Sequence, residues 1–201
     1  MKTNKELRAQ ALASLKGNWG PAILLGLIYL AISGLSSVVP GGSLVVAFLV
    51  TLPFSVGIYE AFRKLVIGEK VQLVEYSFDL GFKNWKHNVA VMGLMTIYTF
   101  LWSLLLIVPG IIKSLSYALT PYIVAEQPEL SANESIELSM KMMDGHKMDL
   151  FVIWLGFIVL SVLCIFTFCI GYLWLLPYMY AKMAAFYEDV KAEYESKNVV
   201  A

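Results

Sequence analysis

Three long stretches without a charged residue constrain this chain more than any other feature. They run over residues 17–59, 88–112 and 150–181. A helix needs about 20 apolar residues to cross the hydrocarbon core of a bilayer, because each residue rises only about 1.5 Å along the axis. The first stretch is long enough for two crossings, and the others become long enough when their flanks are included. The pattern therefore predicts a multi-pass membrane protein.

The composition of the 201 residues agrees with this class. Apolar residues make up 59% and charged residues 15%, against roughly 45–50% and about 25% in soluble domains. In lipid, the backbone polar groups of a spanning segment must be hydrogen-bonded within the protein, so such runs fold as helices. The net charge is zero, which gives no reason to expect a nucleic-acid partner. We therefore expect an all-α polytopic membrane bundle.

The charge-free stretches divide into six membrane helices arranged as three hairpins in one domain, 1–201. Turns near residues 39–43, 108–110 and 167–171 separate the two helices of each hairpin. The last hairpin has the least room, because its charge-free part is short for two crossings. The expected membrane helices are 20–38, 44–66, 88–108, 111–126, 148–166 and 170–187.

The segment 4–16 is typical of an amphipathic helix. Its leucines fall on one side, with Lys5 and Arg8 on the other, and Asn4 is the expected N-cap. This pattern suits a helix that lies on an anionic membrane surface. A solvated arm leading into the membrane explains it equally well.

Two further polar segments are expected to form interfacial helices. Residues 68–87 carry aromatic side chains at helical spacing, which favours a short helix under the bundle or a docking surface for a partner. Residues 131–144 begin with Ser131 and Glu134 in the spacing of a capping box, and Gly145 is a suitable stop. We therefore expect 131–144 to form a cytoplasmic amphipathic helix.

The lysines and arginines predict the orientation of the chain. With six crossings, four segments face one side and hold most of the basic residues, whereas the turns on the opposite side contain none. Basic residues remain cytoplasmic, so both termini are expected in the cytoplasm. The four segments are 1–18, 64–87, 127–147 and 188–201.

Each returning helix contains a proline followed by an aromatic residue. The prolines are Pro53, Pro121 and Pro177. A proline inside a helix frees a carbonyl and bends the axis, so three bent helices could surround a shared cavity. Proline is also common in membrane helices, and a true threefold repeat stays a hypothesis.

Lys113 is the one charged residue well inside an expected span. Intramembrane charges are expensive and usually face a cavity or a partner. Tyr117 and Thr120 share its face, next to Pro121, so these four residues form our candidate polar pocket. The competing interpretation is that Lys113 extends to the nearby outer headgroups.

A second candidate surface lies on the cytoplasmic side. It comprises Glu134, Glu137, Lys141, His146 and Lys147, which could contact a protein partner. These charges also have structural explanations in helix capping and i,i+4 pairing.

The residues show no catalytic, metal-binding or cofactor motif. The two histidines belong to no H-E-x-x-H cluster, and the carboxylates lack the spacing of a calcium loop. Cys164 and Cys169 form no redox motif, and either a disulfide or two buried thiols is possible. We therefore expect no enzyme activity, no metal and no cofactor.

The chain closely resembles domain-of-unknown-function family 975, multi-pass membrane proteins found mostly in Gram-positive bacteria. The block from Pro109 to Lys147 makes the resemblance specific, although it covers essentially the whole chain. The matching motifs are Gly17-Asn18-Trp19, Ile107 to Lys113, Leu115-Ser116-Tyr117, Thr120 to Ile123, Pro128 to Ala132, Ser139-Met140 and Met143-x-Gly145-His146-Lys147.

The resemblance implies a bacterial plasma-membrane protein without an established activity. More distantly, the block is similar to the membrane domain found ahead of some glycerophosphodiester phosphodiesterases. The catalytic domain of those enzymes is absent from this sequence, so their activity is not carried over.

Three functional hypotheses follow. The first is a non-enzymatic protein that binds or organises lipid or other membrane proteins through its cytoplasmic helices. The second is a small permease or exporter that uses the pocket near Lys113. The third is a membrane enzyme that acts on lipid.

The orientation can be tested with single cysteines placed in two of the turns. In a variant without native cysteines, Gly41→Cys and Pro109→Cys should react with an impermeant maleimide from the outside of intact cells. Labelling only after the cytoplasmic side is exposed would overturn the predicted threading.

Overall fold

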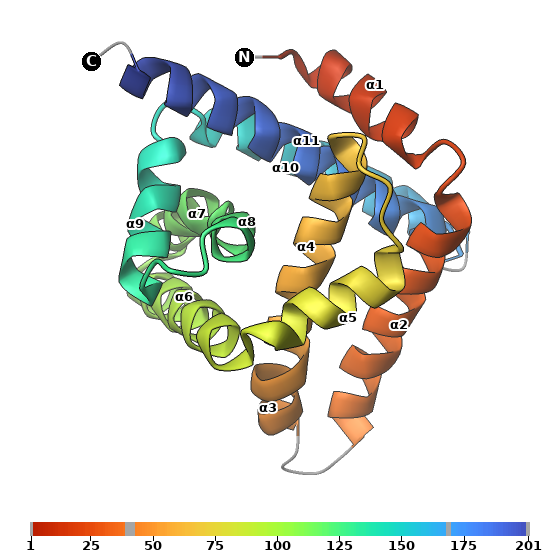
Figure 1. Cartoon of the computed structure of the whole chain (residues 1–201), viewed down its shortest axis with the longest axis horizontal. Helices are drawn as coiled ribbons and strands as arrows, with labels where there is room; N and C mark the ends of the chain where they lie inside the picture. Colours follow the sequence, from red (N-terminus) through yellow and green to blue (C-terminus); the bar gives the residue numbers. More distant parts are fainter. Residues whose placement is uncertain (1, 39–42, 168–169, 200–201) are drawn as a thin grey trace.

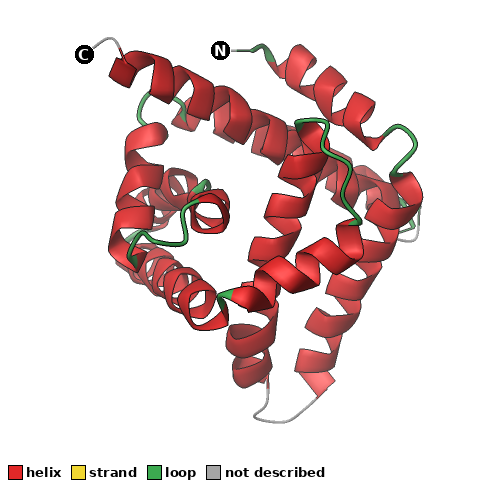
Figure 2. Ribbon diagram, in the orientation of Figure 1, coloured by secondary structure: helices red, strands yellow, loops and turns green. Residues whose placement is uncertain are grey.

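The computed structural model describes residues 2–38, 43–167 and 170–199, which form helices and no strands (Figure 2). Most of the expected first turn, at 39–42, lies outside the described residues. Cys169 does too, so its pairing with Cys164 is not addressed. The elements are α1 (Asn4–Leu15), α2 (Trp19–Val38), α3 (Ser43–Val46), the π-helix η1 (Ala47–Thr51), α4 (Leu52–Val66), α5 (Leu73–Lys83), α6 (Trp85–Leu105), α7 (Ile107–Tyr117), α8 (Thr120–Glu126), α9 (Ala132–Met142), α10 (Lys147–Ile165) and α11 (Tyr172–Val199).

Several of these helices are suited to a membrane. Within the described residues, three segments are long and apolar enough to span one: Trp85–Leu105, Ile107–Glu126 and Lys147–Ile165. A fourth candidate is α1 with α2, a pair that bends by 97°. Large apolar side chains are exposed near the hairpin ends, with Leu104 74% and Phe166 80% exposed. Such surfaces are stable in lipid and not in water.

Two of the six expected membrane helices are divided. Residues 44–66 form α3, the π-helix η1 and α4, and Pro53 lies in the first turn of α4. Residues 111–126 form α7 and α8, separated after Tyr117, and Pro121 occupies the first turn of α8. Proline lacks an N–H group and its ring crowds the preceding turn, which explains why both helices restart next to a proline.

The helix α4 is the centre of the fold. It runs through the middle of the molecule with α5 crossing it (Figure 1), and most of its side chains are buried. A Cβ added to Gly57 would lie 1.9 Å from the carbonyl oxygen of Ser77, and one added to Gly81 would lie 2.8 Å from that of Pro53. These two glycines therefore allow α4 and α5 to cross at backbone contact.

This crossing determines which face of the segment 68–87 packs on the protein, and its role as an interfacial helix or a docking surface stays a prediction. The face of α5 buried against the protein is formed by Leu73, Ser77 and Gly81, whereas Phe78 and Phe82 are about one-third exposed. Small residues face α4 because only they permit the close approach. The ring of Phe78 still packs on the buried Phe54, with centres 4.5 Å apart, so the aromatic stripe is only partly exposed.

The segment 4–16 also differs from expectation. Its N-cap is Thr3, which forms a capping box with Glu6, and not Asn4. Leu7, Ala11 and Leu15 are buried in the main core. The apolar face of α1 therefore packs on the protein, and neither a free surface helix nor a solvated arm describes it.

The helix α9 has the expected capping box. The Ser131 side chain accepts from the Glu134 backbone and the Glu134 carboxylate accepts from Ser131, which lowers the pKa of Glu134. Its far end is followed by Gly145 at φ 87°, a conformation that favours glycine. Ser139 Oγ donates to the Ser116 carbonyl over 2.8 Å, so one face of α9 is buried against α7.

The α4–α5 crossing predicts an asymmetric effect of adding methyl groups. Gly57→Ala should destabilise the protein by more than the ~1–3 kcal/mol typical of overpacking, because the clash is with backbone. Gly156→Ala is the matched control, since no atom lies within 4 Å of the place that its added methyl group would occupy. Thermal unfolding in detergent measures both. Equal melting temperatures for Gly57→Ala and the parent would contradict the crossing.

Candidate functional site

A cavity of about 570 Å³ lies among the apolar helices. This volume falls in the range of small-molecule sites, about 300–1,000 Å³. Its lining comes from α2, α4, α6, α7, α8, α10 and α11, together with Ala118 between α7 and α8. The lining residues are Tyr29, Leu52, Ser55, Tyr59, Met92, Met95, Thr99, Ser114, Tyr117, Ala118, Pro121, Trp154, Phe157, Ile158, Ser161, Leu176, Met179, Tyr180 and Met183.

The wall of the cavity is apolar and adaptable. Four methionines contribute to it, and methionine side chains repack easily around irregular shapes. The hydroxyl groups of Ser55, Thr99 and Ser114 donate to backbone carbonyls of their own helices. These hydroxyls therefore add little polarity to the wall.

The three proline-containing segments meet at this cavity. Leu52 and Ser55 flank Pro53, Pro121 itself lines the wall, and Leu176 and Met179 flank Pro177. The proline pattern thus corresponds to a shared cavity in space. The threefold sequence repeat stays a hypothesis.

The four residues of the sequence-based pocket are distributed differently. Tyr117 and Pro121 line the cavity, and Lys113 and Thr120 do not. The Nζ of Lys113 lies 5.1 Å from the centre of the Trp102 ring and 3.7 Å from the sulfur of Met140. Thr120 is fully buried, and its hydroxyl lacks a hydrogen-bond partner among the described residues.

An aromatic layer closes one end of the cavity. Tyr59 and Tyr180 line it, with ring centres 5.4 Å apart. Tyr122 lies behind Tyr59 at 5.1 Å, and Tyr187 stacks on Tyr122 at 4.6 Å. Offset and edge-to-face pairs of this kind add to the energy of burial. The layer connects the cavity to a buried group of charges.

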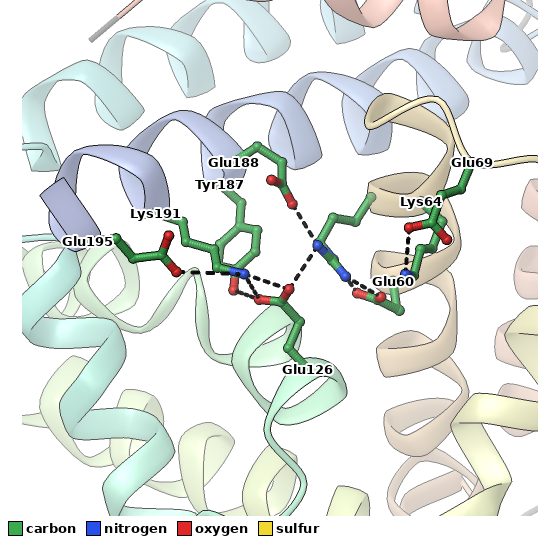
Figure 3. Close-up of polar contacts among 9 residues, drawn as sticks. Glu60, Lys64, Glu69, Glu126, Tyr187, Glu188, Lys191 and Glu195 are labelled. Carbon is green, nitrogen blue, oxygen red and sulfur yellow. Dashed lines mark hydrogen bonds and ion pairs between the residues drawn. The ribbon is translucent and has the colours of Figure 1, made fainter.

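Arg63 is at the centre of that charged group. Its Nε and Nη2 donate to Glu60 over 2.6 and 2.7 Å. Its Nη1 lies 2.8 Å from carboxylate oxygens of both Glu126 and Glu188. The planar guanidinium is suited to such multiple contacts. Arg63 therefore joins α4, α8 and α11 (Figure 3).

Glu126 completes the network on the other side. Lys191 Nζ donates to its two oxygens over 2.7 and 2.9 Å, and the Tyr187 hydroxyl also donates to it. Glu60 and Arg63 are only 3% and 6% exposed. Charges this deeply buried are stable only when they are paired and hydrogen-bonded.

Sequence reasoning found only fragments of this network. The i,i+3 spacing of Glu60 and Arg63 indicates an ion pair within one helix. Nothing local connects that pair to Glu126 or to the last helix, so Tyr187, Glu188 and Lys191 were missed. One signal was available in the sequence: Arg63 lies at the end of one apolar segment, and Glu126 and Glu188 lie at the ends of two others.

The five residues of the expected cytoplasmic contact surface do not form one cluster. Glu134 caps α9, while Glu137 and Lys141 are exposed on that helix. His146 lies 3.5 Å from Glu193 of α11, and Lys147 begins α10. Among the described residues, no group of three His, Cys, Asp or Glu side chains gathers in a geometry that could hold a metal ion.

One protein-family model matches residues 43–194 of the chain. The family is DUF975, which is described as a protein of unknown function. The chain belongs to the DUF975 family. No curated protein and no solved structure matches this chain. The matched region contains Arg63, its three carboxylate partners, Tyr187 and Lys191. It also contains every residue of the cavity wall except Tyr29.

The network predicts that adjacent basic residues differ in importance. Arg63→Gln should cost about 3–5 kcal/mol, because it leaves buried carboxylates without a counter-charge. Lys64→Gln is the control: Lys64 pairs with the exposed Glu69 over 2.8 Å, and such surface pairs contribute less than about 1 kcal/mol. Chemical unfolding in mixed micelles compares them. Equal losses of unfolding free energy in the two variants would show that the network is not a main source of stability.

Proposed function

We propose that this DUF975 protein is a non-enzymatic membrane protein that binds a lipid-like ligand in its central cavity. The observation that carries the proposal is an apolar, methionine-rich cavity of about 570 Å³ among helices whose outer faces suit lipid. An apolar ligand gains free energy in such a site in proportion to the surface it removes from water.

The proposed setting is the bacterial plasma membrane. We propose three hairpins with up to six membrane segments and both termini in the cytoplasm, as the distribution of basic residues favours. Within the described residues, three or four segments are long and apolar enough to span a membrane. The position of α1 modifies this picture. This helix carries charged residues and packs along α11 (Figure 1). Charges are costly at hydrocarbon depth. We therefore place α1 and the face of α11 that it covers at the membrane interface.

The cavity wall indicates the ligand class. Aromatic and methionine side chains surround it, and the buried network lies beyond the tyrosine layer. An acyl or isoprenoid chain matches this apolar wall better than a charged metabolite does, because a charge in it would lack a partner. Polar groups of such a ligand could reach the hydroxyls of Tyr29 and Tyr59.

A small permease is the second candidate. The divided helices favour it, because the π-helix η1 precedes the cavity residue Leu52 and the α7–α8 break lies at Ala118. Broken helices at membrane depth are a feature of transporter binding sites. Flux of a lipid-like substrate in proteoliposomes would distinguish transport from binding alone.

Ligand entry can be tested by filling the cavity. In nanodiscs made with a phosphatidylcholine that carries a photoreactive acyl chain, wild-type protein should be labelled at cavity methionines. Met95→Trp should reduce that labelling at least fivefold, because the indole occupies the space. Mass spectrometry of the peptides locates the labels.

Phe100→Trp is the matched control on the same helix, since Phe100 is 64% exposed. It should leave the cavity labels unchanged. Labels on exposed α10 positions should persist in every variant. A wild-type protein labelled only on its outer surface would refute the proposed function.

A further inference from the structure

A second cavity lies outside the proposed ligand site, between α1, α10 and α11. Its volume is about 430 Å³. Arg8 and Leu12 of α1 form one side, and leucines of α10 and α11 form the floor. The full lining is Arg8, Leu12, Trp19, Leu160, Leu163, Cys164, Thr167, Gly171, Trp174, Leu175 and Tyr178.

Two cations converge at Tyr178, which lies on the wall of this groove. Lys182, one turn further along α11, is 5% exposed. Its Nζ lies 6.0 Å from the centre of the Tyr178 ring and 5.4 Å from that of Phe157. Arg8 lines the same groove as Tyr178. Both basic side chains therefore lie near Tyr178, with Arg8 in the groove lining and Lys182 buried behind it.

Neither cation has a carboxylate partner within the described residues. The ion pairs found there involve other basic groups. Contacts with aromatic faces recover only about 0.5–2 kcal/mol. A buried ammonium without a counter-ion is costly, and a second cation nearby raises that cost. Arg8 is solvent-exposed and carries no such cost, so Lys182 is the group to which a bound anion would supply the missing counter-charge.

The rest of the groove selects the kind of anion. Leu160, Leu163 and Leu175 provide an apolar track, and Trp19 and Trp174 add indoles, which prefer the level of lipid headgroups. A free phosphate ion would leave this track empty. A phospholipid would place its phosphate at the cations and a chain along the leucines.

We propose that the groove between α1, α10 and α11 is a binding site for an anionic phospholipid, whose phosphate lies between Arg8 and Lys182. Basic pockets between membrane helices are suited to such headgroups. Lipid bound there would join α1 to the α10–α11 hairpin. This proposal does not depend on the function proposed for the central cavity, although Phe157, which Lys182 contacts, also lines that cavity.

The test compares lipids added to the purified full-length protein in detergent. Phosphatidylglycerol should raise the melting temperature of the wild type by several degrees more than phosphatidylcholine at the same mole fraction, because bound ligand stabilises the folded state. Inorganic phosphate alone should have little effect. Native mass spectrometry of the same samples should show preferential retention of phosphatidylglycerol.

Variants locate the effect. Arg8→Gln should weaken apparent phosphatidylglycerol binding about tenfold, as expected for one charge-assisted contact, and the double variant with Lys182→Met should abolish the preference. Lys5→Gln removes the same charge from the same helix outside the groove and should behave as wild type. Leu163→Trp should block the track and lower retention with both cations intact.

Three results would overturn the proposal. They are equal stabilisation of the wild type by both lipids, an unchanged preference in Arg8→Gln, and full stabilisation by inorganic phosphate. If a variant does not fold, lipid preference of the wild type in native mass spectrometry still decides. Loss of this preference leaves photolabelling of the central cavity unaffected, so the two proposals fail separately.

Discussion

The buried guanidinium of Arg63 is the interaction on which the rest of the structure depends. It contacts Glu60 on its own helix, Glu126 at the end of α8 and Glu188 on α11. Because each carboxylate would be expensive to bury alone, the network specifies how three helices from separate hairpins meet. The tyrosine layer and the cavity follow from that meeting, since Tyr59, Tyr122 and Tyr187 come from the same three helices.

Proline and glycine serve different purposes in this fold. Pro53 and Pro121 lie where helices restart beside the cavity, so divided helices supply much of its wall. Gly57 and Gly81 bring α5 against α4 at backbone distance. That crossing buries the small-residue face of α5 and leaves Phe78 and Phe82 partly exposed. A scale of hydrophobicity cannot anticipate this choice, because contact distance and not polarity determines which face is buried.

Much of the local structure could be predicted from the sequence, and less of the site. Charge-free runs located α2, α6 and α10 to within a few residues, and the capping box at Ser131 located the start of α9. The candidate pocket was partly misplaced: Tyr117 and Pro121 line the cavity, but Lys113 turns toward Trp102 and Met140. Helical spacing placed these residues on a shared face, and neighbouring helices then decided what each side chain meets.

By itself the sequence determined that this DUF975 chain is helical and rich in long apolar segments, and it marked Pro53 and Pro121, where helices restart; Pro177, of the same pattern, lies inside the continuous α11. These properties depend on the hydrogen bonding of backbone N–H and C=O groups and on residues close together in the chain. Only the tertiary structure decided that Arg63 meets Glu126 and Glu188, and that α1 packs on the protein with Arg8 in a groove beside Tyr178. The reason is physical: pairing of buried charges acts between segments far apart in sequence, and no local pattern encodes the partner.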